Sequence, residues 1–558
     1  MGQEDVQNGN QNKDTEKPVH DADILERIVS HLGDMGRYQK MLFVAMLPAG
    51  FTFAFIYFVQ MFITVTPQNY WCRIPELANL SMEMRKNLSA PGIDGDYDHC
   101  YTFNVNWTEV LETLTPPPHG TPTIPCQHGW EFDFSDIPYQ TVTTERGWVC
   151  DRSSYVPTAQ ATFFVGAVVG TIVFGWTADR FGRVPAIILT NLIGGIGSIG
   201  TSFTTDVWDF MLCRFIVGLS FDNCFMVLYV LVLEYVGLQY RTLVANLSMA
   251  FSFAIAGITL PWIAYYIADW RILMWVTAAP MFIVILAPWF LPESVRWLVS
   301  RGRVDDAVTV LKKFERINKT TIPDDIMNDF KIFAEEARKE ERRSVLEMCK
   351  SSQLRKAMFS LLLMYMGGGI IFDGLMRLSD TFGLDFFALF SCYEVSELVA
   401  ILLVVVILDK FGRRSSSSAS AFISSVALLI AIFVPPGLPR AVLAIVARLF
   451  MITCLTCVMQ WCTEIIPTPY RVSGVSILHM GAVLINTLSP FVVFSERVWS
   501  ILPILIFTGS AFLLTGLCLT LPETKGLPMP QTRADGEKII NENTLFGSKK
   551  RITTPAVP

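Results

Sequence analysis

The feature that most constrains this chain is a set of short motifs that recur at an offset of 230 residues (521 minus 291). Leu-Pro-Glu-Ser at 291–294 returns as Leu-Pro-Glu-Thr at 521–524. The other recurrences are Asp-Arg-Phe-Gly-Arg at 179–183 with Asp-Lys-Phe-Gly-Arg at 409–413, and Glu234, Tyr240 and Arg241 with Glu464, Tyr470 and Arg471. Each match lies beside a long apolar segment. The sequence therefore predicts a membrane protein built from two parallel copies of one unit.

The apolar residues support this prediction. They make up 52% of the 558 residues and gather in blocks of about 20, the length that crosses a ~30 Å hydrocarbon core. The predicted spans are 41–65, 157–177, 184–203, 208–236, 242–266, 271–291, 357–378, 384–408, 416–434, 440–463, 472–494 and 498–521. We expect an all-α protein with twelve transmembrane helices in two pseudo-symmetric halves of six. The net charge of −6 argues against a nucleic-acid partner.

Basic residues predict how the chain is oriented in the bilayer. Segment 292–356 holds fifteen Lys and Arg, whereas 66–156 holds five, and basic loops stay in the cytosol. We expect both termini in the cytosol, and no cleavable signal peptide because the first 40 residues lack an apolar core. The predicted divisions are a tail at 1–40, a first half at 41–291 that includes the outer loop 66–156, a helical cytosolic loop at 292–356, a second half at 357–521 and a tail at 522–558.

The 66–156 loop carries marks of an extracellular segment. It holds the glycan acceptor sites Asn79, Asn87 and Asn106 and the cysteines Cys72, Cys100, Cys126 and Cys150. An even number of cysteines in an oxidising compartment predicts two disulfides. Three connectivities are open, of which we favour the interlaced one.

Several motifs that suggest an enzyme fail on context. Gly-x-Gly-x-x-Gly at 195–200 lies inside an apolar span, whereas a dinucleotide fingerprint joins a strand to a helix. Glycines within a span instead allow helices to pack closely. The sequence has no Gly-Lys dipeptide and no His-Glu-x-x-His motif. We therefore expect no enzymatic activity, no cofactor and no metal site.

The repeated polar residues cluster at the predicted cytosolic ends of helices. Carboxylates there favour helix N-termini and bases favour C-termini. We interpret them as a conformational latch that breaks and re-forms as the halves move, the alternative being plain anchoring to the membrane surface. The predicted latch residues are Asp179, Arg180, Arg183, Glu234, Arg241, Asp409, Arg413, Glu464 and Arg471.

Four features together resemble one transporter family: the Asp-Arg-Phe-Gly-Arg loop, Glu234 closing the fourth span, Pro-Glu-Ser-Val-Arg-Trp-Leu at 292–298, and the large loop after the first span. They resemble the organic cation/carnitine transporter family, a branch of the major facilitator superfamily, including its insect-type carcinine or carnitine transporter-like members. The resemblance covers about residues 40–525. It implies the major facilitator fold and uptake of small organic ions by alternating access at the plasma membrane.

The chain departs from the family at two positions. The family often has a basic or neutral residue where this chain has Asp222. In the eleventh predicted span (472–494), the position that carries the family's charge determinant matches Val483, which is neutral. We therefore look for negative charge elsewhere inside the spans, where ionisable residues are costly and usually functional.

Asp222, Phe225 and Tyr229 share one helical face, and a carboxylate beside aromatic rings suits an ammonium group. Glu394 and Glu397 are three residues apart, so one of the two carboxyls is expected to stay protonated and to offer a proton-coupling site. Glu397 also matches an acidic residue of the family's cation members. The predicted substrate-binding residues are Asp222, Phe225, Tyr229, Phe372, Asp373, Glu394, Glu397, Arg448 and Asn486.

Other interpretations of these residues stay open. Arg377 neutralises Asp373, Glu394 is solvated at the outer interface, or Asp222 pairs with Arg448. We expect a secondary transporter for a small organic cation or zwitterion, such as an amine, a carnitine-like compound or an amino-acid-conjugated amine, with sodium or a proton as coupling ion. The alternatives are an organic anion exchanger using Arg214 and Arg448, and a non-transporting sensor or adhesion protein using the outer loop.

Overall fold

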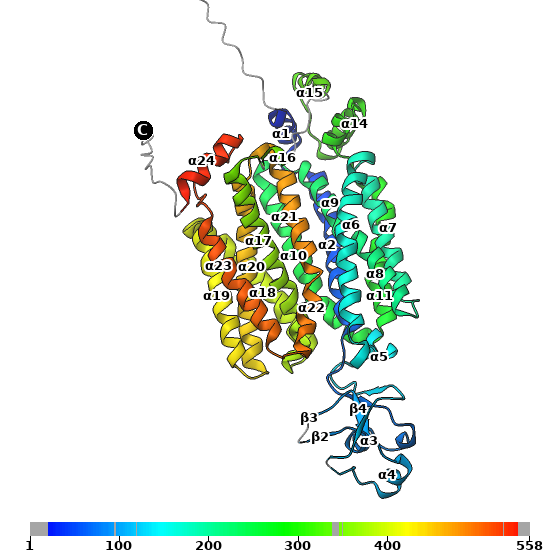
Figure 1. The fold of residues 1–558 in the computed structure, drawn as a ribbon. Helices are drawn as coiled ribbons and strands as arrows, with labels where there is room; N and C mark the ends of the chain where they lie inside the picture. The colour runs from blue at the N-terminus through cyan, green and yellow to red at the C-terminus, as the bar shows by residue number, and fades with distance from the viewer. Residues whose placement is uncertain are drawn as a thin grey trace, which may run out of the picture.

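A computed structural model describes residues 21–93, 96–118, 120–336, 345–348, 350–527 and 529–544 of the chain. A bundle of long helices carries a small lobe at one end (Figure 1). We call this end the loop end. At the opposite end, the tail end, lie α1 (Asp21–Leu32), α14 (Val304–Asn318), α15 (Asp324–Glu336) and α24 (Arg533–Asn543) (Figure 1).

The bundle consists of membrane-spanning helices. Among the described residues, eleven helices are long and apolar enough to cross a bilayer. The remaining predicted span, 242–266, falls within α10 (Leu238–Ile267), whose apolar part Phe251–Ile267 is shorter. These helices confirm that the chain is an all-helical, multi-pass membrane protein.

The helices follow the order predicted from the sequence. The first half contains α2 (Arg37–Thr64), α6 (Tyr155–Phe181), α7 (Arg183–Thr201), α8 (Val207–Phe221) with α9 (Asn223–Glu234), α10, and α11 (Trp270–Ala278) with η3 (Ala279–Leu286) and α12 (Ala287–Phe290). The second contains α17 (Ser352–Arg377) with η5 (Leu378–Phe382), α18 (Phe386–Phe411), α19 (Arg413–Phe433), α20 (Leu438–Ile465), η6 (Thr468–Tyr470), α21 (Arg471–Asn486) with α22 (Ser489–Phe494) and η7 (Ser495–Arg497), and α23 (Leu502–Thr520). The fourth span therefore consists of α8 and α9, and Asp222 lies where they join, with α-helical backbone angles.

Small residues allow the closest helix packing inside the first half. A Cβ added to Gly170 of α6 would lie 2.0 Å from the carbonyl oxygen of Leu219 in α8. A Cβ added to Gly218 of α8 would lie 2.0 Å from the carbonyl oxygen of Phe163 in α6. The two backbones touch because neither residue has a side chain, as is common between helices in a membrane. Between the halves, α10 packs on α18, and α6 packs on α21 and α22.

The 230-residue repeat is also a repeat of structure. Gly182 and Gly412 precede α7 and α19 with φ of +112° and +84°, values that favour glycine. The Glu293 carboxylate accepts hydrogen bonds from the amides of Arg183 (2.7 Å) and Val184 (3.2 Å).

Glu523 does the same in the second half. It accepts from the amides of Arg413 (2.8 Å) and Arg414 (3.1 Å). A carboxylate at a helix N-terminus satisfies free N–H groups and meets the positive end of the helix dipole. The repeated Pro-Glu motif thus ties the end of the sixth helix of each half to the start of its third.

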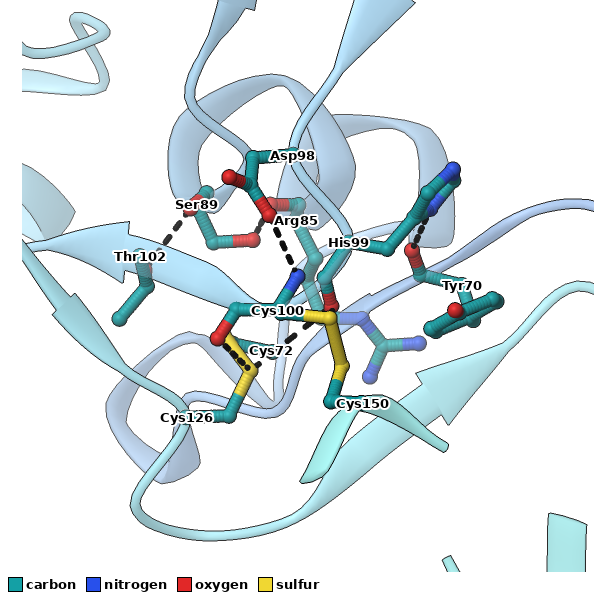
Figure 2. Close-up of a disulfide and its surroundings, with 10 residues drawn as sticks. All are labelled: Tyr70, Cys72, Arg85, Ser89, Asp98, His99, Cys100, Thr102, Cys126 and Cys150. Atoms are coloured by element: carbon teal, nitrogen blue, oxygen red, sulfur yellow. Dashed lines mark hydrogen bonds between the residues drawn. A yellow bond between two sulfur atoms is a disulfide. The ribbon is translucent and has the colours of Figure 1, made fainter. Parts of the chain in front are cut away.

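The lobe at the loop end is small and cross-linked. It contains β1 (Tyr70–Cys72), β2 (Gly92–Ile93), β3 (Asp96–Tyr97), β4 (Tyr101–Phe103), β5 (Thr123–Pro125), β6 (Trp130–Phe132), η1 (Pro75–Leu77), α3 (Met82–Ser89) and α4 (Trp107–Thr113). The strands pair antiparallel as β1–β6, β2–β3 and β4–β5. Disulfides join Cys72 to Cys126 and Cys100 to Cys150, an interlaced arrangement (Figure 2).

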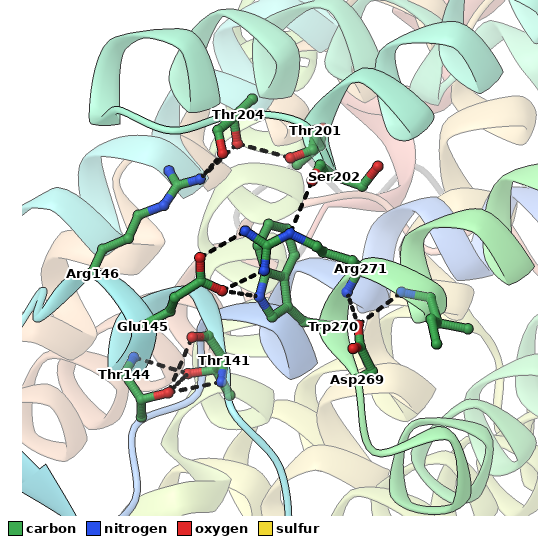
Figure 3. Close-up of polar contacts among 11 residues, drawn as sticks. Thr141, Thr144, Glu145, Arg146, Thr201, Ser202, Thr204, Asp269, Trp270 and Arg271 are labelled. Atoms are coloured by element: carbon green, nitrogen blue, oxygen red, sulfur yellow. Dashed lines mark hydrogen bonds and ion pairs between the residues drawn. The ribbon is translucent and has the colours of Figure 1, made fainter.

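The end of the lobe is fixed to the first half. Glu145 of α5 (Val142–Arg146) accepts from both Nη atoms of Arg271 and from Nε1 of Trp270 (2.9 Å) at the start of α11 (Figure 3). Arg146 donates to Thr204 in the turn before α8 (Figure 3). Hydrogen bonds from Arg271 hold the pKa of Glu145 below its usual value.

The central linker forms helices, as the apolar spacing of the sequence predicts. They are α13 (Val295–Ser300), α14, α15 and α16 (Val345–Met348). Phe314 of α14 is fully buried, with its ring 4.5 Å from those of Tyr38 and Tyr235. Asn318 accepts from the amide of Tyr38 at 2.8 Å. These contacts fix α14 to the tail end of the first half.

Candidate functional site

The predicted substrate residues of α18 and α20 meet around one guanidinium. Nη2 of Arg448 lies 2.9 Å from Glu394 and 3.5 Å from Glu397, and Nη1 donates to the carbonyl of Phe372 at 2.8 Å. The guanidinium stacks over the Phe372 ring at 4.2 Å and lies 5.6 Å from the Tyr393 ring. We call these five residues the Arg448 cluster.

The cluster lies near the middle of the bundle. Arg448 is ten residues into the 28-residue α20, which at 1.5 Å per residue is ~15 Å from the loop end of that helix. Arg448 and Glu394 are fully buried and Glu397 is 13% exposed. Two carboxylates facing one guanidinium leave a formal charge of −1 when all three ionise. Because Glu394 is fully buried, the suggestion that it is solvated at the outer interface is wrong.

Glu394 also touches the first half. Its Oε2 has no hydrogen-bond partner among the described residues. A Cβ added to Gly257 of α10 would lie 2.3 Å from this oxygen and 2.5 Å from Cγ of Glu394. The absence of a side chain at Gly257 therefore lets α18 bring a carboxylate against α10 at the interface of the halves.

Asp373 forms a second polar cluster nearer the loop end. Arg377, four residues on, donates to it through Nε (2.6 Å) and Nη2 (3.1 Å), as the more conservative interpretation of the sequence expects. The hydroxyl of Tyr57 in α2 donates to Asp373 at 2.6 Å, and Nη1 of Arg377 donates to Gln160 in α6 at 2.6 Å. These bonds join the two halves and neutralise the Asp373 charge.

Aromatic rings reinforce this junction of the halves. Phe62 of α2 lies 5.2 Å from Phe386 and 4.9 Å from Phe390 of α18, and Phe58 lies 5.2 Å from Phe390. Gln68 donates to the carbonyl of Asp380 at 2.8 Å. The loop end of the bundle is therefore closed by an apolar and hydrogen-bonded contact between halves.

Asp222 contacts the other half through a partner that the sequence analysis did not propose. Its Oδ1 lies 3.0 Å from Nε2 of His479 on α21. Asp222 is 5% exposed, and the His479 side chain 32%. The suggested pairing of Asp222 with Arg448 is wrong, because Arg448 is held by the acids of α18. His479 is the one histidine within the predicted spans, and this position could have marked it as a candidate site residue.

The predicted aromatic substrate residues differ in their burial and in their ring contacts. Phe225 is fully buried and stacks on Phe53 at 5.7 Å, so it belongs to the packed core of the first half. Tyr229 lies 5.7 Å from Phe225 and is only partly buried. The Phe372 ring face is occupied by Arg448. Asn486 has a buried Oδ1 without a partner among the described residues.

Arg214, the other base proposed for an anion exchanger, lies apart from this site. It is 1% exposed, and its guanidinium lies 5.2 Å from the Phe163 ring. Its Nη atoms have no hydrogen-bond acceptor among the described residues. Because Arg448 is bound by two carboxylates, the two bases do not form a joint anion site.

The predicted latch residues contact partners within one half. Arg413 lies 2.8 Å from Glu464, which also accepts from Thr524 at 2.6 Å. In the first half Arg183 lies 3.2 Å from Asp179, and Glu234 accepts from Ser294.

The remaining latch residues are more dispersed. Arg241 lies 3.9 Å from Glu26 of α1, and Arg471 donates to Thr468 at 3.2 Å. Arg180 is exposed, and the structure does not describe the side chain of Asp409. We call Asp179, Arg183, Glu234, Glu293 and Ser294 the first clamp, and Arg413, Glu464, Glu523 and Thr524 the second.

A cavity of about 180 Å³ opens at the loop end between the halves. Its lining includes Gln160, Arg377, Asp380, Glu496 and Arg497.

No group of three His, Cys, Asp or Glu residues that could hold a metal occurs in the part of the chain that the structure describes.

Comparisons with known proteins give the family. The Sugar (and other) transporter family matches residues 134–534. This chain belongs to that family. It is 30% identical over 551 residues to the carcinine transporter of Drosophila melanogaster, covering 94% of this chain and 81% of that protein. It is 30% identical to solute carrier family 22 member 1 of Oryctolagus cuniculus, covering 93% and 95%. The resemblance to the organic cation/carnitine transporter family is thereby confirmed.

The fold agrees with this family. The inward open conformation of the xylose transporter XylE from E. coli matches with a TM-score of 0.58 at 14% identity, over 89% of this chain and 99% of that one. A partially occluded inward open conformation of the same transporter matches with a TM-score of 0.56. The chain has the major facilitator fold, and its relatives are transporters rather than enzymes.

Proposed function

We propose that this protein carries small organic cations or zwitterions across the plasma membrane by alternating access. The observation that carries this proposal is the Arg448 cluster, where two carboxylates face one guanidinium near mid-depth and give a formal charge of −1 when all three groups are ionised. Substrate sites of such transporters lie near the midplane, at the interface of the halves. The names of the relatives, which include a carcinine transporter, favour the same class of cargo.

The route to this site follows from the contacts between the halves. Tyr57, Gln160 and the phenylalanines of α2 and α18 close the loop end in this state. Binding from the loop end requires these contacts to open. We propose that the two clamps keep each half rigid during this movement, since their described contacts join helices of a single half.

The orientation is part of the proposal. Asn79, Asn87 and Asn106 are all exposed on the lobe, and the cysteines of the lobe are paired. Glycans and disulfides both belong to an extracellular surface. We therefore propose that the loop end faces outward and that both termini lie in the cytosol.

An uptake assay tests the cargo. The purified full chain in liposomes, or the chain at the surface of cells, should take up a labelled quaternary ammonium in a saturable manner. Unlabelled carcinine and carnitine serve as competitors, and a dicarboxylate serves as the control anion. Competition by the dicarboxylate alone would contradict the proposal and favour an anion exchanger.

A further inference from the structure

Asp222 and His479 form a contact between a carboxylate and an imidazole. No other described side-chain contact between the halves pairs these two groups. Asp222 lies where α8 joins α9, and its partner lies 257 positions later on α21. Because a carboxylate only accepts, Nε2 of His479 carries the hydrogen. One member of this contact between the halves is therefore an imidazole, a side chain that can take up or release a proton.

His479 points toward the inside of the bundle. Ile477 and Leu484 are 39% and 53% exposed and share one face of α21, which marks the side toward lipid. His479 follows Ile477 by two residues, a rotation of about 200°, and so lies on the opposite face. The His479 side chain is 32% exposed, and its Nε2 lies 3.0 Å from Asp222 of the other half.

The charged groups around the imidazole are already bound to one another. Helices α6, α17 and α20 pack against α21. On α17, Asp373 is paired with Arg377, and the Tyr365 hydroxyl contacts the sulfur of Met459. On α20, Arg448 is paired with Glu394. On α6, residues 156–178 contain no charged side chain.

The groups on the Asp222 side do not compete for the imidazole. Cys224, two residues on, donates its S–H to the carbonyl of Phe221. The partly buried Tyr229 lies two turns away. On α2, which packs on α9, Tyr57 is bound to Asp373. Among the described residues, Asp222 is the side chain that the His479 ring contacts by a hydrogen bond.

We propose that Asp222 and His479 form an exchange site at which a proton on the imidazole and the organic cation compete for one carboxylate. With His479 protonated, the pair is neutral and bridges the halves. When the ammonium group of the cargo reaches Asp222, one carboxylate faces two cations. The imidazolium then releases one ring proton to water, the carboxylate pairs with the cargo, and the charge is unchanged.

This inference rests on the proposed cation transport and adds its coupling. Because one cation enters as one proton leaves, the exchange is electroneutral for a monovalent cargo. A proton gradient that is acid inside should then accumulate the cation up to about tenfold for each pH unit, in the limit of tight coupling. Protons and cargo should also compete, so that lower pH on the cargo side raises KM and leaves the maximal rate unchanged.

The test uses the full chain in liposomes with the membrane potential clamped to zero. The lumen is set at about pH 6 and the outside at about pH 8, so that the gradient spans the imidazole range. Labelled quaternary ammonium uptake and a luminal pH dye are recorded together. We expect uptake to rise severalfold over a matched pH, and the lumen to become more alkaline when the cation is added.

Variants then assign the effect to the pair. His479→Gln keeps an N–H donor but cannot change charge, so it should carry the cation without proton stimulation and without a dye signal. Asp222→Asn should lose both. His31→Gln, at the exposed end of α1, is the matched control and should behave as wild type.

Each result has one meaning. No saturable cation uptake by the wild type under any gradient contradicts the proposed function itself. Uptake that is indifferent to the gradient contradicts only the exchange site, as does proton stimulation that survives in His479→Gln. If that variant does not fold, the alkalinisation on adding cation to the wild type decides, because exchange requires it and simple uniport does not produce it.

Discussion

The repeated tail-end clamps and the unrepeated interior of the bundle differ in how their residues are used. At the tail ends, Glu293 and Glu523 bind the first amides of the third helix of their own half, at 2.7 Å and 2.8 Å respectively. In the interior, Asp222, Asp373, Glu394 and Glu397 have no acidic counterpart 230 residues away. The repeat therefore supports the scaffold, and the residues that depart from it supply the charges that a cargo meets.

The two clamps differ in the partner of their arginine. Arg413 crosses to Glu464 at the end of α20, whereas Arg183 pairs with Asp179 within the preceding turn. Glu234 is left to the hydroxyl of Ser294. The shared element is thus the carboxylate cap on the backbone, and the Arg–Glu pair is a feature of the second half. If the account is right, interior changes alter uptake with little effect on stability, and clamp changes do the reverse.

The largest expected effect is on uptake in Glu397→Gln. With all groups ionised, the change makes the Arg448 cluster neutral and removes its attraction for a cationic cargo, a loss of about 1.5–3 kcal/mol or roughly 10- to 150-fold in kcat/KM. Initial uptake rates and thermal unfolding in detergent measure the two quantities separately. The matched control is Glu112→Gln on the exposed surface of the lobe. Unchanged uptake at a normal amount of folded protein would remove the cluster from the site.

Gly257→Ala should have the next largest effect. The new Cβ would lie 2.3 Å from Oε2 of Glu394, so α10 and α18 must separate or the carboxylate must move. We expect uptake to fall severalfold while the protein still folds. Gly516→Ala in α23 is the control, since its added Cβ meets nothing within 4 Å. Equal uptake by the two variants would show that this contact between the halves is not needed.

Glu523→Ala should lower stability rather than uptake. Removing a helix cap costs about 1–2 kcal/mol, so the melting temperature should fall by a few degrees. The same change at Glu293 should give a similar shift, because the two caps have the same geometry. Uptake per folded molecule should stay near the wild-type value for both. A large loss of uptake with no change in melting would assign the clamps a direct role in the transport cycle instead.

The smallest effect is expected for Glu145→Gln at the loop end. Glu145 has a lowered pKa because Arg271 donates hydrogen bonds to it, so its contribution is present above the ordinary carboxyl range and is lost as pH falls through the lowered value. The pair is partly exposed, and its loss should cost below about 1 kcal/mol. Melting curves from pH 7 down to about pH 3 should show the wild type converging on the variant. A constant gap at every pH would contradict this assignment.

Much of the scaffold could be predicted from the sequence because it depends on local patterns. Blocks of apolar residues predict the spans, and the 230-residue repeat marks the clamps. The pairing of Asp373 with Arg377 is also local, since four residues place two side chains on one helical face.

The contacts between distant helices could not be predicted in this way. The partner of Asp222 depends on how the two halves dock, and His479 lies 257 residues away. The same limit explains the wrong suggestion that Asp222 pairs with Arg448. The importance of Glu293 and Glu523 could be predicted, because both belong to the repeated motif. The repeat alone does not say which amides they bind.

The central claim is that the negative interior selects a cationic cargo. The most direct measurement is competition for saturable uptake of a labelled quaternary ammonium by the full chain in liposomes, in wild type and in Glu397→Gln. We predict that unlabelled organic cations compete, that dicarboxylates do not, and that the variant loses most of the uptake. Competition by dicarboxylates together with full activity of the variant would contradict the account.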